Sequence, residues 1–261
     1  MDFVSAFVPN RVISRTTLRI IILFQVAIAL LIWINSPFPV LPQPDEVGRA
    51  FHSLWFTQGL GRELWTSFTL NLQALALTVV ISLALSYLTV MPFFRPITAA
   101  ATKGRFLGLI GLTFLFTLMV GGGRPLKLGL LVFGMTVFFV TSMAAEVLSI
   151  PREKFDHART LRMNEWRVVW EVVILGTADK AVEVLRQNAA IGWMMLTMVE
   201  GISRSEGGVG AMLLNQNKHF HLAEVFAIQI TILLVGLFQD YMIGALGRLL
   251  FPYAELVRER R

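Results

Sequence analysis

Long uncharged apolar stretches alternate with short charged ones along this chain. A membrane-spanning helix needs about 20 apolar residues to cross roughly 30 Å of hydrocarbon, and a helix satisfies its own backbone groups there. Six stretches meet or approach this pattern, at residues 20–38, 66–90, 106–123, 128–145, 181–201 and 225–247. The fifth is the weakest, because only residues 189–199 are cleanly apolar. The pattern predicts an all-α membrane protein with six transmembrane helices.

Residues 45–65, between the first two predicted spans, have a different pattern. Val47, Phe51, Leu54 and Trp55 recur at helical spacing among polar residues, which predicts an amphipathic helix. Such a helix can lie at a membrane interface. It can equally pack as a helix of an extramembrane loop, and the sequence leaves both alternatives open.

Charge then predicts the orientation in the membrane. The composition is 55% hydrophobic with a mean hydropathy of +0.66, and the net charge is +6. With the N-terminus inside, the predicted cytoplasmic segments hold 16 of the Lys and Arg residues and the outer segments hold 6. Because basic residues concentrate on the cytoplasmic side, we expect both termini to be cytoplasmic in a multi-pass membrane protein. The basic charge therefore indicates a membrane and no nucleic acid.

The predicted cytoplasmic loop at residues 151–180 carries many charges of both signs in a helical pattern. Orientation alone requires only positive charge there. A mixed-charge helical loop fits a docking surface for a soluble partner, and it also fits a solvated pair of cytoplasmic helices.

A few polar residues lie in or beside the apolar stretches. Glu200 and Asp240 are candidates for a translocation path, because charges in a membrane usually face a cavity or a partner. A structural hydrogen bond is the alternative for both, and the water interface is a further one for Glu200. Asn188 is a third candidate, beside small residues that permit close helix packing. Glu183 and Arg186 are spaced to form an ion pair.

The sequence contains little that indicates a catalytic or a metal-binding site. The chain has no cysteine and no Gly-x-x-x-x-Gly-Lys-Ser/Thr sequence, so it lacks the loop that holds ATP phosphates and magnesium. His219 and His221 have no set of partners at metal-ligand spacing, and we expect no metal site. No arrangement of nucleophile and base stands out, so we expect no catalytic residue and no enzyme activity.

Several segments resemble ABC importer permeases, the binding-protein-dependent inner-membrane components. Asp156-His157-Ala158 takes the place of the family's Glu-Ala-Ala, and residues 172–175 take the place of its Ile-x-Leu-Pro. Four further phrases resemble the nitrate, sulfonate and taurine branch of the family, over residues 66–251: Ala158-Arg159-Thr160-Leu161, Met198-Val199-Glu200-Gly201, Gly207-Gly208-Val209-Gly210 and Gln239-Asp240.

The sequence also departs from the family pattern. Arg162 stands where the family has Gly, and Leu175 and Asp179 stand where two prolines are usual. A left-handed helix cap costs a non-glycine residue about 1 kcal/mol, so we expect the turn after the docking helix to differ.

The resemblance implies a type I importer permease-like fold. Residues 66–251 would form the transmembrane core with a cytoplasmic coupling loop at 151–180, after an N-terminal helix and periplasmic segment at 1–65 and before a cytoplasmic tail at 252–261. A separate ATPase would bind ATP and Mg and dock on the helix around residues 152–162. The implied contact residues are Phe155, Asp156, Ala158, Arg159 and Thr160, and three of them, Phe155, Ala158 and Arg159, share one helical face.

The other implied partners are a second permease copy and an extracytoplasmic solute-binding protein, which would dock on the outer loop at 202–222. The solute would be small, such as nitrate, a sulfonate or taurine. The alternative is a secondary transporter or channel that is not coupled to ATP. That class predicts internal repeats with broken helices at matched positions, and none is visible in the sequence.

Overall fold

A computed structural model describes residues 8, 14–38, 40–203 and 206–252. The predicted cytoplasmic tail at 252–261 therefore lies almost wholly outside the described residues. All secondary structure in the described ranges is helical, which confirms the all-α prediction.

Eleven α-helices follow one another along the described chain. They are α1 (Arg15–Ile34), α2 (Pro44–Phe56), α3 (Leu60–Leu88), α4 (Arg95–Lys103), α5 (Leu109–Val120), α6 (Arg124–Leu148), α7 (Arg152–Thr160), α8 (Glu165–Val168), α9 (Ala178–Ile202), α10 (Val209–Lys218) and α11 (Leu222–Leu250). Shorter helical turns connect some of them: η2 (Pro92–Phe94), η3 (Gly104–Phe106), η4 (Val169–Ile174) and η5 (Leu175–Thr177).

Four helices, α1, α3, α6 and α11, are long and apolar enough to cross a membrane. A fifth span results if Pro92–Phe106 and Leu109–Val120 count as one, but this pair is bent by 115°. The predicted fifth stretch at 181–201 lies in α9, which is 25 residues long and carries several charges in its first half. Six spans and cytoplasmic termini therefore remain predictions.

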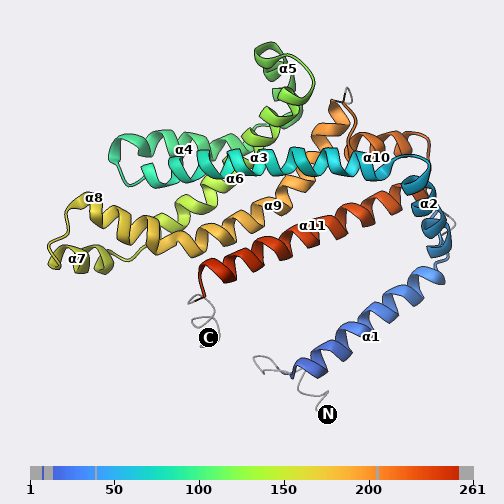
Figure 1. Cartoon of the computed structure of the whole chain (residues 1–261), viewed down its shortest axis with the longest axis horizontal. Helices are drawn as coiled ribbons and strands as arrows, with labels where there is room; N and C mark the ends of the chain where they lie inside the picture. Colours follow the sequence, from blue (N-terminus) through green and yellow to red (C-terminus); the bar gives the residue numbers. More distant parts are fainter. Residues whose placement is uncertain (1–7, 9–13, 39, 204–205, 253–261) are drawn as a thin grey trace.

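The centre of the molecule is the packing of α3, α6 and α9, with α10 and α11 against α9 (Figure 1). Small polar residues recur along the buried side of α3, and three of them, Thr78, Ser82 and Ser86, are four residues apart. Small side chains let helix backbones approach closely in a membrane. Close packing of α3 against its neighbours follows from this stripe.

The predicted amphipathic helix at 45–65 is two elements. Gly59 has a φ of 74°, a left-handed conformation that glycine adopts readily, and it separates α2 from α3. Val47 and Leu54 are buried where α2 packs on α11 and α3. The structure therefore favours a packed loop helix on that side, whereas Phe51 and Trp55 stay exposed.

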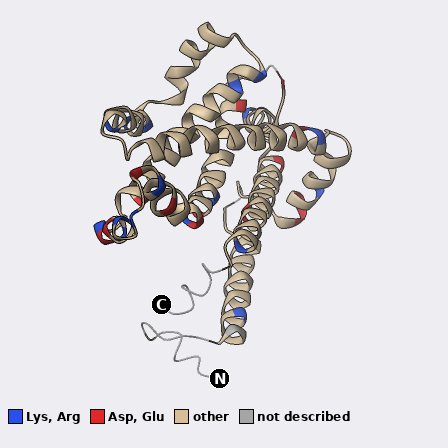
Figure 2. Ribbon diagram, turned by 60° about the vertical axis from the view of Figure 1, so that its left-hand side comes forward, with Lys and Arg blue, Asp and Glu red and all other residues tan. Residues whose placement is uncertain are grey.

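Helix α1 stands away from the bundle, and α5 projects from it while packing on α6. Figure 1 shows α1 extending from the end that carries α2, and α5 projecting on the opposite side. The apolar window of α1 has no buried residue, and its last turn is tied down by Trp33, whose Nε1 donates to Pro42 O at 3.0 Å. Figure 2 shows the long helices mostly free of charge, with a dense group of charged residues around α7.

The crossing of α9 and α10 generates a stability prediction. A Cβ added to Gly210 would lie 2.4 Å from the carbonyl oxygen of Thr197 and 2.7 Å from its Cα. Backbone atoms cannot move aside cheaply, so Gly210→Ala should lower the free energy of unfolding by about 1–3 kcal/mol. Thermal denaturation in mild detergent measures this loss.

Gly48→Ala in α2 is the matched control, because no heavy atom lies within 4 Å of its added Cβ. Replacing a helical glycine by alanine at an open position should raise stability, by up to about 1 kcal/mol. A melting temperature of Gly210→Ala equal to that of the wild type would contradict the close approach.

Candidate functional site

The charged helix α7 lies at one end of the bundle, beside α8 (Figure 1). It begins after Pro151, whose extended backbone ends the preceding turn. Glu153 lies in its first turn, and His157 and Arg159 lie in its last, an order that complements the helix dipole. A helix is therefore present where the docking helix is predicted, at residues 152–162, and it is two residues shorter than expected; its docking role stays a prediction.

The turn that ends α7 is left-handed despite the arginine. Arg162 has a φ of 56°, and its N–H donates to Arg159 O at 2.9 Å. The N–H of Met163 donates to Ala158 O at 3.4 Å. These two bonds form the Schellman pattern that usually has glycine at this position. The expectation that the turn would differ is therefore wrong, because the hydrogen bonds of the cap hold Arg162 in a conformation that its Cβ disfavours.

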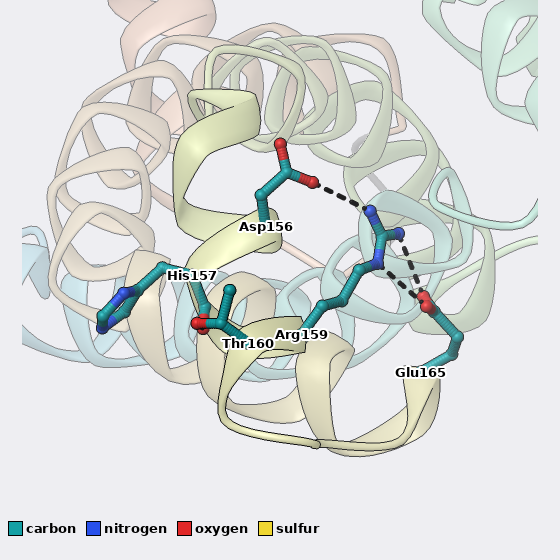
Figure 3. A network of polar contacts seen from close by, with 5 residues as sticks. All are labelled: Asp156, His157, Arg159, Thr160 and Glu165. Carbon is teal, nitrogen blue, oxygen red and sulfur yellow. Dashed lines mark hydrogen bonds and ion pairs between the residues drawn. The ribbon is translucent and has the colours of Figure 1, made fainter.

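Three charged side chains join α7 to α8 (Figure 3). Arg159 contacts Asp156 at 3.2 Å, and its Nε donates to Glu165 at 3.0 Å. All three side chains are more than half exposed, so these ion pairs contribute little to stability. Their effect is geometric: they fix the side chain of Arg159 over the turn. His157 points away from this network.

The ion pair persists at neutral pH. The hydrogen bond from Arg159 holds the pKa of Glu165 below its usual value, and the same contact raises the pKa of Arg159. A carboxyl group with a lowered pKa keeps the stabilisation of its pair above the usual range and loses it as the pH falls through the lowered pKa. The network should therefore open only in acid.

The five predicted contact residues do not form one outward face. Ala158 is 5% exposed, and Phe155 is half-buried against a cluster of Phe139, Met143, Val147, Val173 and Val184. Phe155 and Ala158 face the chain's own core while Arg159 is exposed, so the three do not share one exposed face; the contact with an ATPase stays a prediction. Asp156, Arg159 and Thr160 are exposed.

After α8 the chain stays helical without the family's prolines. A π-helical segment, η4, covers residues 169–174, and Leu175 follows in η5. Asp179 lies in the first turn of α9, where an acidic residue suits the helix dipole. Thr177 Oγ1 donates to Val173 O at 2.7 Å, which ties this irregular segment together. The two absent prolines thus leave one continuous helical path from α8 into α9.

Glu200 lies in a buried polar network at the N-terminus of α10. Ser67 Oγ donates to its two carboxylate oxygens at 2.7 and 2.9 Å, and the N–H of Gly210 donates to it at 2.9 Å. The N–H of Val209 donates to Ser67 Oγ at 2.8 Å. Glu200 is 0% exposed, so it does not lie at the water interface. Its contacts support the alternative that it makes structural hydrogen bonds.

Two further charges complete this network. Glu63 accepts a hydrogen bond from the N–H of Gly208, and Lys127 Nζ donates to Gly207 O at 2.8 Å. Three successive N–H groups at the start of α10 thus meet oxygens from α3 and α9. A helix N-terminus favours negative charge, so two carboxylates fit here. Sequence reasoning missed Glu63, Ser67 and Lys127, because their partners are far away along the chain.

Asp240 and Asn188 have separate surroundings. Arg186 donates to the two carboxylate oxygens of Asp240 at 2.6 and 3.0 Å, and it lies 3.6 Å from Glu183, the pairing expected from sequence. Asn188 is buried, and its Nδ2 donates to Val184 O at 3.0 Å. No described contact joins Asn188, Glu200 and Asp240, so the three translocation candidates do not form one site.

The histidine pair binds its own chain. His219 Nδ1 lies 2.8 Å from Asn215 O, and His221 Nδ1 lies 2.7 Å from Gln216 Oε1. Among the described residues, no group of three potential ligands is placed to hold a metal ion.

The sequence and the fold were compared with those of known proteins. Neither a protein-family model nor a curated protein matches the sequence. A chain of the MetNI methionine ABC transporter, solved in inward facing conformations, superimposes with a TM-score of 0.58 and 18% identity, over 77% of this chain and 97% of that one. This chain has the fold of ABC importer transmembrane subunits.

A second solved structure with the same fold is a bacterial ABC transporter involved in the import of the acidic polysaccharide alginate. Its chain superimposes with a TM-score of 0.59 and 12% identity, over 88% of this chain and 90% of that one. Both alignments cover most of each chain, so the likeness concerns the fold of the chain as a whole. At these identities the likeness shows the fold and leaves the transported solute open.

The left-handed arginine generates a second prediction. Arg162→Gly should raise the free energy of unfolding by about 1 kcal/mol, because glycine adopts this conformation without steric cost. The neighbouring Leu161 has a φ of −79°, so Leu161→Gly is the matched control and should not stabilise the protein. Thermal denaturation of both variants in one detergent gives the comparison, and equal melting temperatures would contradict the strained turn.

Proposed function

We propose that this chain is the transmembrane permease subunit of an ATP-driven ABC importer. It would form the translocation path for a small solute by alternating access, driven by a separate ATPase. The sequence resemblance to the nitrate, sulfonate and taurine branch makes a small anion our candidate solute. We place both termini in the cytoplasm and the chain, with six spans, in the plasma membrane.

The proposal rests on the way α7 packs against the rest of the bundle. Its outer face offers the exposed charges of Asp156 and Arg159 to solvent, while Phe155 enters a cluster with residues of α6, η4 and α9. A soluble partner that binds the charged face would therefore push on three helices of the bundle at once. Coupling between ATP use by the partner and the state of the bundle requires a packed element that both share, and α7 would be that element.

The partner would supply the nucleotide chemistry. ATP and Mg would be held by the ATPase, since this sequence lacks the phosphate-binding loop. Because Phe155 and Ala158 face inward, their role in docking would be to hold α7 in place. Direct contact would fall to Asp156, Arg159 and Thr160, with His157 beside them.

The remaining partners follow from the same proposal. A second copy of the permease would complete the path by two-fold symmetry. A solute-binding protein would dock at the opposite end of the bundle from α7, on residues 202–222, where α10 lies (Figure 1).

The ion pair between Arg186 and Asp240 bridges α9 and α11 and is our candidate for a contact that changes between states. Asn188 would line the path, and Glu200 would hold α10.

The test is docking of the ATPase. In the double variant Asp156→Arg, Arg159→Glu the charges of α7 are exchanged, and the chain should lose nucleotide-dependent ATPase activity that co-purifies with it from membranes in mild detergent. The matched control exchanges another exposed pair, Asp45 and Arg49, whose atoms lie 2.8 Å apart on α2. Asp45→Arg, Arg49→Glu should keep the ATPase.

The exchange also brings a second carboxylate next to Glu165, so Asp156→Lys serves as a second variant that leaves the contact between Arg159 and Glu165 intact. Normal co-purification and uptake in both α7 variants would contradict the docking surface. A preparation free of ATPase that moves solute into liposomes would favour the secondary transporter or channel.

A further inference from the structure

The break between α4 and α5 interrupts an apolar helical pair. Pro92–Phe106 and Leu109–Val120 together are long and apolar enough for a span, yet their axes differ by 115°. Just before the break, η3 lies directly on α6: a Cβ added to Gly104 would be 2.9 Å from Val137 Cγ1. Irregular backbone within an apolar segment is tolerated where it is buried in protein or lines a cavity.

Arg105 lies at this break without a carboxylate partner. No ion pair involves it in the described part of the chain, and its guanidinium carbon lies 5.1 Å from the centre of the Phe106 ring. The sequence offers no nearby partner, since Asp and Glu are absent between Glu63 and Glu146. A charge in an apolar segment usually faces a cavity, a partner or the membrane surface.

A cavity of about 310 Å³ lies against this arginine. Arg105 is its one charged lining residue, and Phe133, Phe138, Met194, Met195 and Met198 are among the apolar ones. Small-molecule sites are mostly apolar hollows of a few hundred Å³ with a few polar groups that fix orientation. Methionine side chains adapt to varied apolar shapes, which suits a wall that contacts a ligand.

We propose that this cavity binds an amphipathic anion, with its charged group on Arg105 and its apolar part against the methionines of α9. Two sources supply such a ligand: an anionic phospholipid of the surrounding bilayer, or a transported organic anion. Only the second source rests on the function proposed above. The proposal itself stands on the unpaired cation, the apolar cavity and the broken helix that joins them.

The natural absence of cysteine allows a direct test with the full chain. Met198→Cys places a single thiol on the cavity wall, and its rate of modification is measured with a negatively charged and a positively charged methanethiosulfonate of similar size. One positive charge at about 6 Å in water favours the anion by about threefold. Because the same charge disfavours the cation by a similar factor, we expect the anion-to-cation rate ratio to fall about three- to tenfold on adding Arg105→Gln.

Arg248→Gln is the matched control, because Arg248 is also exposed and lies 5.8 Å from the ring centre of Tyr241, on α11 away from the cavity. It should leave the ratio unchanged. If Met198→Cys reacts with neither reagent, Met194→Cys, which is 65% exposed, replaces it as the reporter. An unchanged ratio in Arg105→Gln would overturn the proposal.

Protection of the same thiol from modification identifies the source of the anionic ligand. In nanodiscs of phosphatidylcholine, protection by hexanesulfonate but not by hexanol would indicate an organic solute. Protection that requires phosphatidylglycerol in the disc would indicate a lipid. Either protection should disappear with Arg105→Gln and remain with Arg248→Gln. No protection by either anion, or protection that survives the loss of Arg105, would overturn the site.

Discussion

The position of α7 depends on the packing of Phe155 against the apolar cluster at the end of the bundle where α7 lies. Without it, α7 would be held only by the small buried side chain of Ala158 and by exposed ion pairs to α8, and such ion pairs contribute little. With it, the charged helix and the apolar helices α6 and α9 share one packed contact. A packed core transmits displacement because its side chains interdigitate at close to crystal density. The same residue thus explains why α7 keeps its position and how it would act on the bundle.

A second constraint operates at the other end of the molecule. Buried polar groups must find partners, and this requirement is strictest among apolar helices. Glu200, Ser67 and Lys127 meet it by binding backbone atoms at the start of α10, which joins α3, α6 and α9 to one short helix. The bundle is therefore fixed at both ends by different interactions, apolar at α7 and polar at α10.

Local patterns in the sequence were enough to predict some of this. Apolar length predicted α3, α6 and α11, and charge density predicted α7, because both signals lie within one segment. The residues facing the core were harder: helical spacing grouped Phe155 with Arg159, but the neighbouring cluster, not the spacing, decides which side of α7 is buried. The partners of Glu200 could not be predicted, since Ser67 is 133 residues away. The bend at residues 107–108 was also missed, because Leu107 and Gly108 have ordinary extended backbone angles, with φ of −79° and −70°, that many residue types adopt.

We propose that α7 is the contact between this chain and a separate ATPase, and cross-linking from a single cysteine can show whether the two proteins touch there. Asp156→Cys in the naturally cysteine-free chain, treated with a short thiol-reactive photo-cross-linker in native membranes, should capture a protein that carries a Gly-x-x-x-x-Gly-Lys-Ser/Thr loop. Asp45→Cys on α2 should not capture it. We expect such an ATPase to be captured from position 156 and not from position 45. No ATPase captured from position 156, while the chain still moves solute in the same membranes, would contradict it.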